Sequence, residues 1–197
     1  MEEISEFGAG PGARVEIDGA WAELLGLRSK LADIVGVVLP NPRPRRAVTF
    51  GKTSAGNWLV PWHQDRVVAV KDVVPSAEYS AWGRKQGVWH AEPPIGVLQN
   101  MVFVRAHLDD ATAEDGALEI ALGSHEAGRV SADTAAEIAN AYPNEICEAR
   151  RGDVLIAHAL ILHRSQKSLS ANLRRALRVD YSADKLPGGA QWAYGGP

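Results

Sequence analysis

The chain has 197 residues, of which 46% are hydrophobic and 23% are charged, and its formal net charge is −3. This length suits one domain with a sizeable core, and the composition is that of a soluble globular protein. The small negative charge argues against general binding to nucleic acid or to an anionic membrane. The single cysteine, Cys147, excludes an intrachain disulfide and a cysteine-rich metal site, and it favours a reducing compartment.

The first part of the chain predicts a helix and a loop. The N-terminal residues, MEEISEFGAGPG, are acidic and lack the apolar run of a secretory signal, so we expect a cytoplasmic protein. Residues 19–35 carry apolar side chains at helical spacing, which predicts one helix. The following stretch, VVLPNPRPRR, contains three prolines and predicts a loop. We therefore expect one domain over residues 1–197, in which residues 1–45 pack on a β core formed by residues 46–197.

Short β-like runs dominate the chain after residue 46. Glycine and proline separate them, which is typical of a sandwich or barrel of short strands. Short helices are predicted at 95–100 and 132–141. We expect a mainly β protein with helices packed outside. The predicted strands lie in RAVTFG, VVAVK, MVFVRAHL, ALEIAL, DVLIAHALIL and RRALRVDY.

The stretch PWHQD places His63 and Asp65 two residues apart. In an extended segment these residues project from the same face, so an imidazole and a carboxylate would point at one place. Two later histidines, His158 and His163, could each add a third ligand. Two histidines and one carboxylate form the facial triad of non-haem Fe(II) sites, which leaves coordination positions open. A closed structural zinc site would instead use four protein ligands.

Four segments together resemble the phytanoyl-CoA dioxygenase family of Fe(II)- and 2-oxoglutarate-dependent oxygenases. The resemblance implies a double-stranded β-helix, the jelly-roll or cupin-like barrel. It also implies an enzyme that uses Fe(II), 2-oxoglutarate and O2 to hydroxylate a C–H bond of a small molecule, releasing succinate and CO2. Asp65 favours hydroxylation, because related halogenases lack this carboxylate. The segments are NWLVPWHQD (57–65), HLDDATAEDGALEIALGSHEAG (107–128), GDVLIAHALILHRS (152–165) and RRAL (174–177).

The resemblance assigns the iron ligands to His63, Asp65 and His163, because His163 stands in the family's His-x-Ser context. His158 stays open as an alternative to His163.

The resemblance also assigns the distal carboxylate of 2-oxoglutarate to Arg174, eleven residues after His163, with Ser165 assisting. A guanidinium suits this role because it forks onto a carboxylate through two charge-assisted hydrogen bonds. Arg175 stays open as the alternative, since alternation along RRALRVDY places it on the more apolar face, where a core would be expected.

Other residues are candidates for the cofactor or substrate. Lys52 precedes the triad by about one strand and turn and could reach 2-oxoglutarate, although a solvated turn would also explain it. Arg105 and His107 alternate on one face of MVFVRAHL and are substrate candidates, unless that face lies outside. Trp62 could wall the pocket, although tryptophans more often belong to a core.

Two rival functions are open at this point. A cupin-type metalloenzyme would not use 2-oxoglutarate and would usually offer three or four histidines in close strands. A non-catalytic ligand-binding barrel would carry the same polar groups without metal chemistry. We expect a small-molecule substrate, and neither nucleic acid nor a membrane as partner. The chain is short for the family, so the site is either open or closed by a second subunit of a homo-oligomer.

Overall fold

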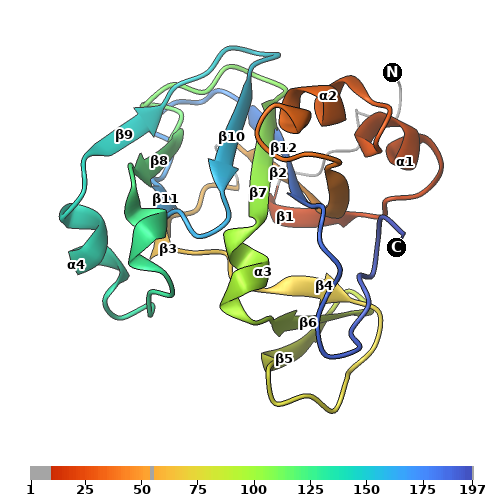
Figure 1. Cartoon of the computed structure of the whole chain (residues 1–197). Helices are drawn as coiled ribbons and strands as arrows, with labels where there is room; N and C mark the ends of the chain where they lie inside the picture. Colours follow the sequence, from red (N-terminus) through yellow and green to blue (C-terminus); the bar gives the residue numbers. More distant parts are fainter. Residues whose placement is uncertain (1–9, 54–55, 197) are drawn as a thin grey trace.

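The computed structural model describes residues 10–53 and 56–196, and most of its elements are strands (Figure 1). In chain order the elements are β1 (Gly10–Val15), α1 (Gly19–Leu25), α2 (Lys30–Gly36), β2 (Arg43–Lys52), β3 (Val60–His63), β4 (Val68–Val70), β5 (Ser80–Lys85), β6 (Val88–Glu92), α3 (Ile95–Gln99), β7 (Met101–His107), β8 (Leu118–Ala121), the 3-10 turn η2 (Ser124–Ala127), α4 (Ala135–Asn140), β9 (Asn144–Cys147), β10 (Val154–His158), β11 (His163–Ser165) and β12 (Arg174–Ser182).

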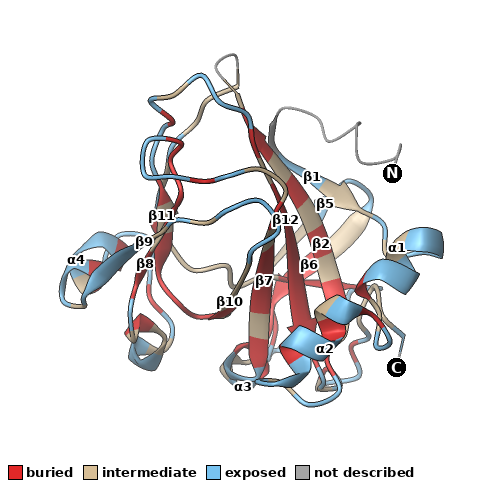
Figure 2. Ribbon diagram, turned by 90° about the horizontal axis from the view of Figure 1, so that it is seen from above, coloured by how far each residue is buried: buried red, intermediate tan, exposed pale blue. Residues whose placement is uncertain are grey.

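Two antiparallel sheets face each other and enclose the interior (Figure 2). The larger sheet has the order β1-β2-β12-β7-β10, and the smaller has the order β3-β11-β8-β9. Phe103 and Ala157 from the larger sheet pack against Leu118 and Ile120 from the smaller one. This is the predicted mainly β fold with flanking helices, a double-stranded β-helix.

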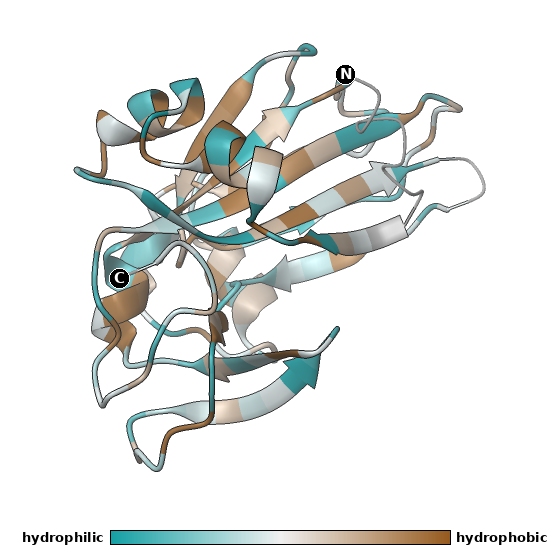
Figure 3. Cartoon of the chain, turned by 90° about the vertical axis from the view of Figure 1, so that its right-hand side faces the viewer, coloured by the Kyte–Doolittle hydropathy of each residue, from teal (hydrophilic) through white to brown (hydrophobic). Residues whose placement is uncertain are grey.

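Strand β12 has two faces of different character, and both are buried. Leu177, Val179 and Tyr181 pack against Leu25 of α1 and Val35 of α2, outside the larger sheet. The apolar face therefore lies beneath the helices, and the polar face that begins at Arg174 points between the sheets. Hydrophilic and hydrophobic residues alternate along the strands in the same way in Figure 3.

The predicted helix over residues 19–35 is two helices, α1 and α2. An added Cβ at Gly26 would collide with the carbonyl oxygen of Ala22, so glycine suits the end of α1. The side chain of Ser29 then begins α2 by accepting a hydrogen bond from the backbone N–H of Ala32 at 3.1 Å. No helix within the described ranges is long and apolar enough to cross a membrane.

The predicted boundary at residue 45 is misplaced, and part of the predicted loop is strand. β2 begins at Arg43, and β1 adds an edge strand to the larger sheet. Pro44 fits into β2 because the register against β12 shifts between Asp180 and Tyr181. Proline has no backbone N–H to donate to a regular ladder. It is tolerated at such an irregularity because the ladder is interrupted there. The other predicted strands and the two short helices, α3 and α4, are present.

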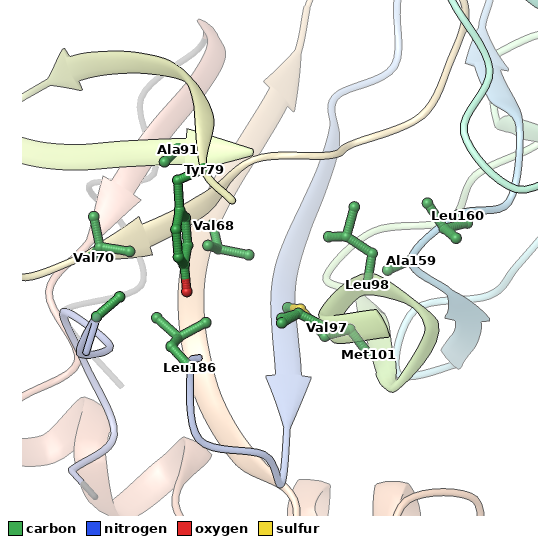
Figure 4. Close-up of a cluster of buried hydrophobic side chains, with 11 residues drawn as sticks. Val68, Val70, Tyr79, Ala91, Val97, Leu98, Met101, Ala159, Leu160 and Leu186 are labelled. Carbon is green, nitrogen blue, oxygen red and sulfur yellow. The ribbon is translucent and has the colours of Figure 1, made fainter. Parts of the chain in front are cut away.

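A third sheet, with the order β4-β6-β5, is joined to the barrel by an apolar cluster (Figure 4). The cluster contains Tyr79, Val68 and Val70 of β4, Leu98 of α3 and Leu186 near the C-terminus. Burying one such side chain contributes about 2 kcal/mol, so the cluster fixes the β4–β6 unit against the larger body.

Candidate metal centre

His63, Asp65 and His163 lie together between the two sheets. β3 and β11 are antiparallel, and their register sets His63 opposite His163. The centroids of the two imidazole rings are 4.2 Å apart. The Oδ2 atom of Asp65 lies 3.4 Å from Nε2 of His163. One potential ligand atom from each residue lies within 4.8 Å of the others, so the structure brings the predicted triad to one point.

Both histidines present the same nitrogen to that point. Nδ1 of His63 donates to the carbonyl oxygen of Pro61 at 2.8 Å, and Nδ1 of His163 donates to that of Ile161 at 3.0 Å. A carbonyl oxygen only accepts, so each neutral ring carries its proton on Nδ1 and leaves Nε2 with a lone pair. Such second hydrogen bonds orient metal-binding histidines. Burial and the neighbouring His163 lower the pKa of His63, which keeps its ring neutral.

The donor set fits Fe(II). Two neutral imidazoles and one carboxylate suit a divalent transition metal, and three ligands leave positions open for other molecules. Burial works against the charged form of Asp65, but Arg178, His163 and Arg46 together hold the carboxyl pKa well below its usual range. Among the residues that the structure describes, no second group of His, Cys, Asp or Glu gathers in this way.

His158 does not join the group. Its Nε2 lies 3.0 Å from the carbonyl oxygen of Gln99, and its Nδ1 accepts from the backbone N–H of Leu160 at 3.1 Å. Both ring nitrogens are therefore engaged elsewhere. The structure thus favours His163 over His158 as the third ligand.

A cavity of about 220 Å³ adjoins the triad, and we call it the triad cavity. It is rich in guanidinium groups, and Asp65 is the one carboxylate among its lining residues. Such a site favours a ligand that carries negative charge. Its lining residues are Phe50, Trp58, Val60, His63, Asp65, Arg105, Leu118, His163, Arg164, Ser165, Arg174 and Arg178.

Arg174 reaches this cavity with unused hydrogen-bonding capacity. It is 3% exposed, yet within the described part of the chain its Nε and Nη1 atoms have no hydrogen-bond partner. Burial lowers its pKa to about 10, against the opposing effect of Asp115. A buried guanidinium with two unpartnered nitrogens is costly, so this arrangement is suited to a bound anion.

Lys52 and Ser165 surround Arg174. Lys52 lies opposite Arg174 in the β2–β12 ladder. The Oγ atom of Ser165 accepts from Lys52 Nζ at 2.9 Å and from Arg174 Nη2 at 3.5 Å, and it donates to the Gly116 carbonyl oxygen at 2.9 Å. Burial, followed by the charges of Arg174 and Arg105, lowers the pKa of Lys52 to about 7. Lys52 is thus a buried amine rather than part of a solvated turn.

Most of the chain matches one protein family in sequence. A family model described as Phytanoyl-CoA dioxygenase (PhyH) matches residues 14–176. The chain belongs to the phytanoyl-CoA dioxygenase family. This confirms the resemblance inferred from the four segments. No curated protein sequence matches the chain significantly.

Solved structures share the fold of this PhyH-family chain at low sequence identity. AviO1 from Streptomyces viridochromogenes is 22% identical with a TM-score of 0.62, over 89% of this chain and 68% of that one. The non-heme alpha ketoglutarate dependent carbocyclase SnoK from nogalamycin biosynthesis is 18% identical (TM-score 0.59, 86% of this chain and 62% of that one). EctD from S. alaskensis with bound Fe is 17% identical (TM-score 0.58, 83% and 53%). This chain therefore spans between about half and two thirds of these proteins.

Arg175, the alternative to Arg174, points the other way. It forks onto Asp109 through Nε–Oδ2 and Nη2–Oδ1 contacts of 2.8 and 2.9 Å. Its guanidinium is thus already paired, and it does not line the triad cavity. Of the two adjacent arginines, Arg174 is the one that can bind an anion there.

The three substrate candidates have different outcomes. Arg105 lines the triad cavity with its Nε atom unpartnered among the described residues, and burial together with Arg174 lowers its pKa to about 9. His107 is buried beside Arg105, outside the cavity lining, and burial lowers its pKa to about 4. The prediction that Trp62 walls the pocket is wrong, because Trp62 packs against Ala135 and Ala139 of α4. It precedes His63 in β3 and therefore projects from the opposite face.

Arg178 is the residue that the sequence analysis missed. Its Nη1 atom donates to Oδ2 of Asp65, and its Nε atom donates to Oδ1 of Asp180 at 2.8 Å. Asp180 also accepts from Nε of Arg46 at 2.5 Å. The signal was present in the alternation of β12, which places Arg178 on the same face as Arg174. Arg178 thus links the triad carboxylate to a buried network of alternating charges.

Gln64, which lies between His63 and Asp65 just after β3, forms three hydrogen bonds to the backbone of neighbouring loops. Its Nε2 atom donates to the carbonyl oxygens of Gly128 and Leu160 at 2.8 and 2.7 Å. Its Oε1 atom accepts from the backbone N–H of Val130 at 2.9 Å. These bonds hold the segment that carries His63 and Asp65 against the loops on either side.

Proposed function

We propose that the chain is an Fe(II)- and 2-oxoglutarate-dependent dioxygenase that hydroxylates a C–H bond of a small molecule and releases succinate and CO2. The observation that carries the proposal is one cavity with two halves. One half contains Nε2 of His63, Nε2 of His163 and the Asp65 carboxylate. The other half contains the Arg174 guanidinium, whose Nε and Nη1 atoms have no partner among the described residues. Membership of the PhyH family supports it.

The protein's part is to hold and position the reactants. His63, Asp65 and His163 would hold the iron, and Arg178 would keep the Asp65 carboxylate ionised and oriented through its hydrogen bond. When bound, Fe(II) supplies the redox chemistry that couples decarboxylation of 2-oxoglutarate by O2 to oxidation of the substrate.

Arg174 would bind the distal carboxylate of 2-oxoglutarate. The guanidinium can donate two parallel hydrogen bonds from either of its edges, Nε with Nη2 or Nη1 with Nη2, and each edge contains one atom without a partner among the described residues. Ser165 and Lys52 would keep the guanidinium in place, since Ser165 accepts from both. Phe50, Val60 and Leu118 add apolar surface to the same cavity and would limit its water content.

The test is an anaerobic titration of the protein with Fe(II) and 2-oxoglutarate, followed by the visible charge-transfer band of a chelated 2-oxo acid. We expect the band in the wild type and none in His163→Ala. Arg174→Ala should need far more 2-oxoglutarate, and Arg175→Ala is the matched control that should behave like the wild type. Absence of the band in reduced, metal-loaded wild type would reject the proposal in favour of a cupin-type metalloenzyme or a binding barrel.

A further inference from the structure

A second cavity, of about 260 Å³, lies next to the triad cavity, and we call it the cationic cavity. Both cavities are lined by Phe50, Asp65 and Arg178, so these three residues form the wall between them. The cationic cavity is otherwise lined by Gly12, Arg14, Arg46, Val48, Lys85 and Gln86. Residues of β1, β2 and the β5–β6 turn thus meet beside the triad carboxylate.

The charge of this cavity is unbalanced. Arg14, Arg46, Lys85 and Arg178 are cationic, and Asp65 is the one carboxylate in the lining. Behind the wall, Asp180 pairs with both Arg46 and Arg178. Within the described part of the chain, neither Arg14 nor Lys85 takes part in an ion pair. Among the described residues, these two positive charges therefore lack a counter-charge.

Arg14 is nevertheless held in place. Its Nη1 atom bonds to Nε2 of His90, and Nδ1 of His90 donates to the carbonyl oxygen of Val88 at 3.0 Å. Burial and then Arg14 lower the pKa of His90 to about 4, so the ring is a neutral acceptor. Burial and then Arg46 lower the pKa of Arg14 itself. The guanidinium is thus positioned without being neutralised.

We propose that the cationic cavity binds an anionic group, a carboxylate or a phosphate, on the substrate of the proposed oxygenase. Guanidinium groups fork onto such oxyanions, and crowded cations without counter-charges are stabilised by an anion. The position fits a substrate rather than 2-oxoglutarate, because Arg14, Arg46 and Lys85 do not line the triad cavity that holds Arg174. The anionic end of the substrate would lie across the wall from the metal centre.

This inference rests on the proposed function, and its test separates the two. Protein loaded with Fe(II) and saturating 2-oxoglutarate, without oxygen, is titrated with inorganic phosphate and separately with acetate, and binding is followed by calorimetry. We expect saturable binding of one of these anions. Arg14→Gln and Lys85→Gln should each weaken it about tenfold, the value of one charge-assisted hydrogen bond. The two anions distinguish a phosphate-bearing from a carboxylate-bearing substrate.

Arg84→Gln is the matched control. Arg84 neighbours Lys85 in β5 and is also exposed, but it lies over the ring of Trp89 and outside the cavity lining. Lys85 is exposed too, so Lys85→Gln tests the site even if Arg14→Gln fails to fold. Equal weakening by Arg84→Gln and Lys85→Gln would overturn the proposal, because it would indicate general attraction. Displacement of the anion by 2-oxoglutarate, or no saturable binding, would overturn it as well.

The charge-transfer band reports on the proposed function independently. Arg14→Gln and Lys85→Gln should retain the band, since neither residue lines the triad cavity. A band without anion binding would leave the oxygenase standing and refute the cationic cavity as a substrate site. Anion binding without a band in the wild type would overturn both the oxygenase and the substrate assignment.

Discussion

The two faces of β12 carry adjacent arginines in opposite circumstances. On the outer face, Arg175 is fully paired with Asp109, and it lies beside the apolar residues that pack under the helices. On the inner face, Arg174 is buried with two guanidinium nitrogens unpartnered among the described residues. Buried polar groups are normally satisfied within a folded protein, so the outer face is satisfied by its own pair, whereas the inner face has hydrogen-bonding capacity left over.

The inner face itself has two parts. Arg178 lies on the same face of β12, four residues after Arg174, and is paired with both Asp65 and Asp180. Like Arg175, Arg178 has carboxylate partners for its guanidinium, but one of them, Asp65, is a member of the triad. The comparison predicts that substitutions at these three arginines separate stability from ligand binding.

Arg178→Met should have the largest effect on stability. It leaves Asp65 and Asp180 without their shared cation in a buried site, and breaking a buried pair costs about 3–5 kcal/mol. Denaturant unfolding of the metal-free protein measures this cost, and Fe(II) affinity should fall in the same variant. A loss of less than about 1 kcal/mol, the value of an exposed pair, would contradict the buried network.

Arg174→Met should produce the reverse pattern. The 2-oxoglutarate affinity should fall about a hundredfold, because two charge-assisted hydrogen bonds are lost. The free energy of unfolding without ligand should stay constant or rise by about 1 kcal/mol, since a buried charge with unpaired nitrogens is removed. Calorimetry and denaturant unfolding on one preparation give both values. A destabilised variant with unchanged 2-oxoglutarate affinity would assign Arg174 to the structure instead.

Lys52, which lies opposite Arg174 in the β2–β12 ladder, should make 2-oxoglutarate binding depend on pH. Burial and the charges of Arg174 and Arg105 move its pKa from the ordinary 10.5 to about 7, so the amine loses its charge as the pH rises through neutrality. The 2-oxoglutarate affinity should therefore fall by about tenfold from pH 6 to pH 9, because a positive charge beside Arg174 that favours a bound anion is lost. Lys52→Met should remove this dependence, and the exposed Lys71→Met should keep it.

The same shift makes a prediction about stability, with a definite sign. Between pH 7 and pH 10.5 the unfolded chain binds a proton at Lys52 that the folded protein has released. The contribution of Lys52 to stability must then increase with pH across this window. Unfolding measured at several pH values in the wild type and in Lys52→Met isolates the contribution. A steeper rise in the variant would contradict the lowered pKa.

The sequence predicted most of this fold because its strands alternate strongly and its turns carry glycine or proline. It predicted the triad because His63 and Asp65 share one face of an extended segment, and it placed His163 through the family resemblance. The pattern of β12 was harder, because both of its faces are buried and the more apolar one lies outside the barrel. Alternation alone could not decide between Arg174 and Arg175 for that reason.

The errors have physical causes as well. Trp62 was a candidate for the pocket wall, but it is adjacent to His63 in β3, and adjacent residues of a strand point to opposite sides. The break between α1 and α2 depends on Gly26 and on the Ser29 cap. The helical spacing of the apolar residues continues across this break, so it predicted one helix. Arg178 was missed because its partner Asp65 comes from a distant segment that only the folded barrel brings to β12.

Arg175→Met should have the smallest effect and completes the comparison. Its pair with Asp109 is partly exposed, with side-chain exposures of 25% and 20%, so its loss should cost no more than about 1 kcal/mol. The charge-transfer band and the 2-oxoglutarate affinity should equal those of the wild type. Asp109→Asn should reproduce the small loss, and the double variant should add nothing to it, because one interaction is removed in each case. A change in 2-oxoglutarate affinity in any of the three would mean that the two faces of β12 are coupled.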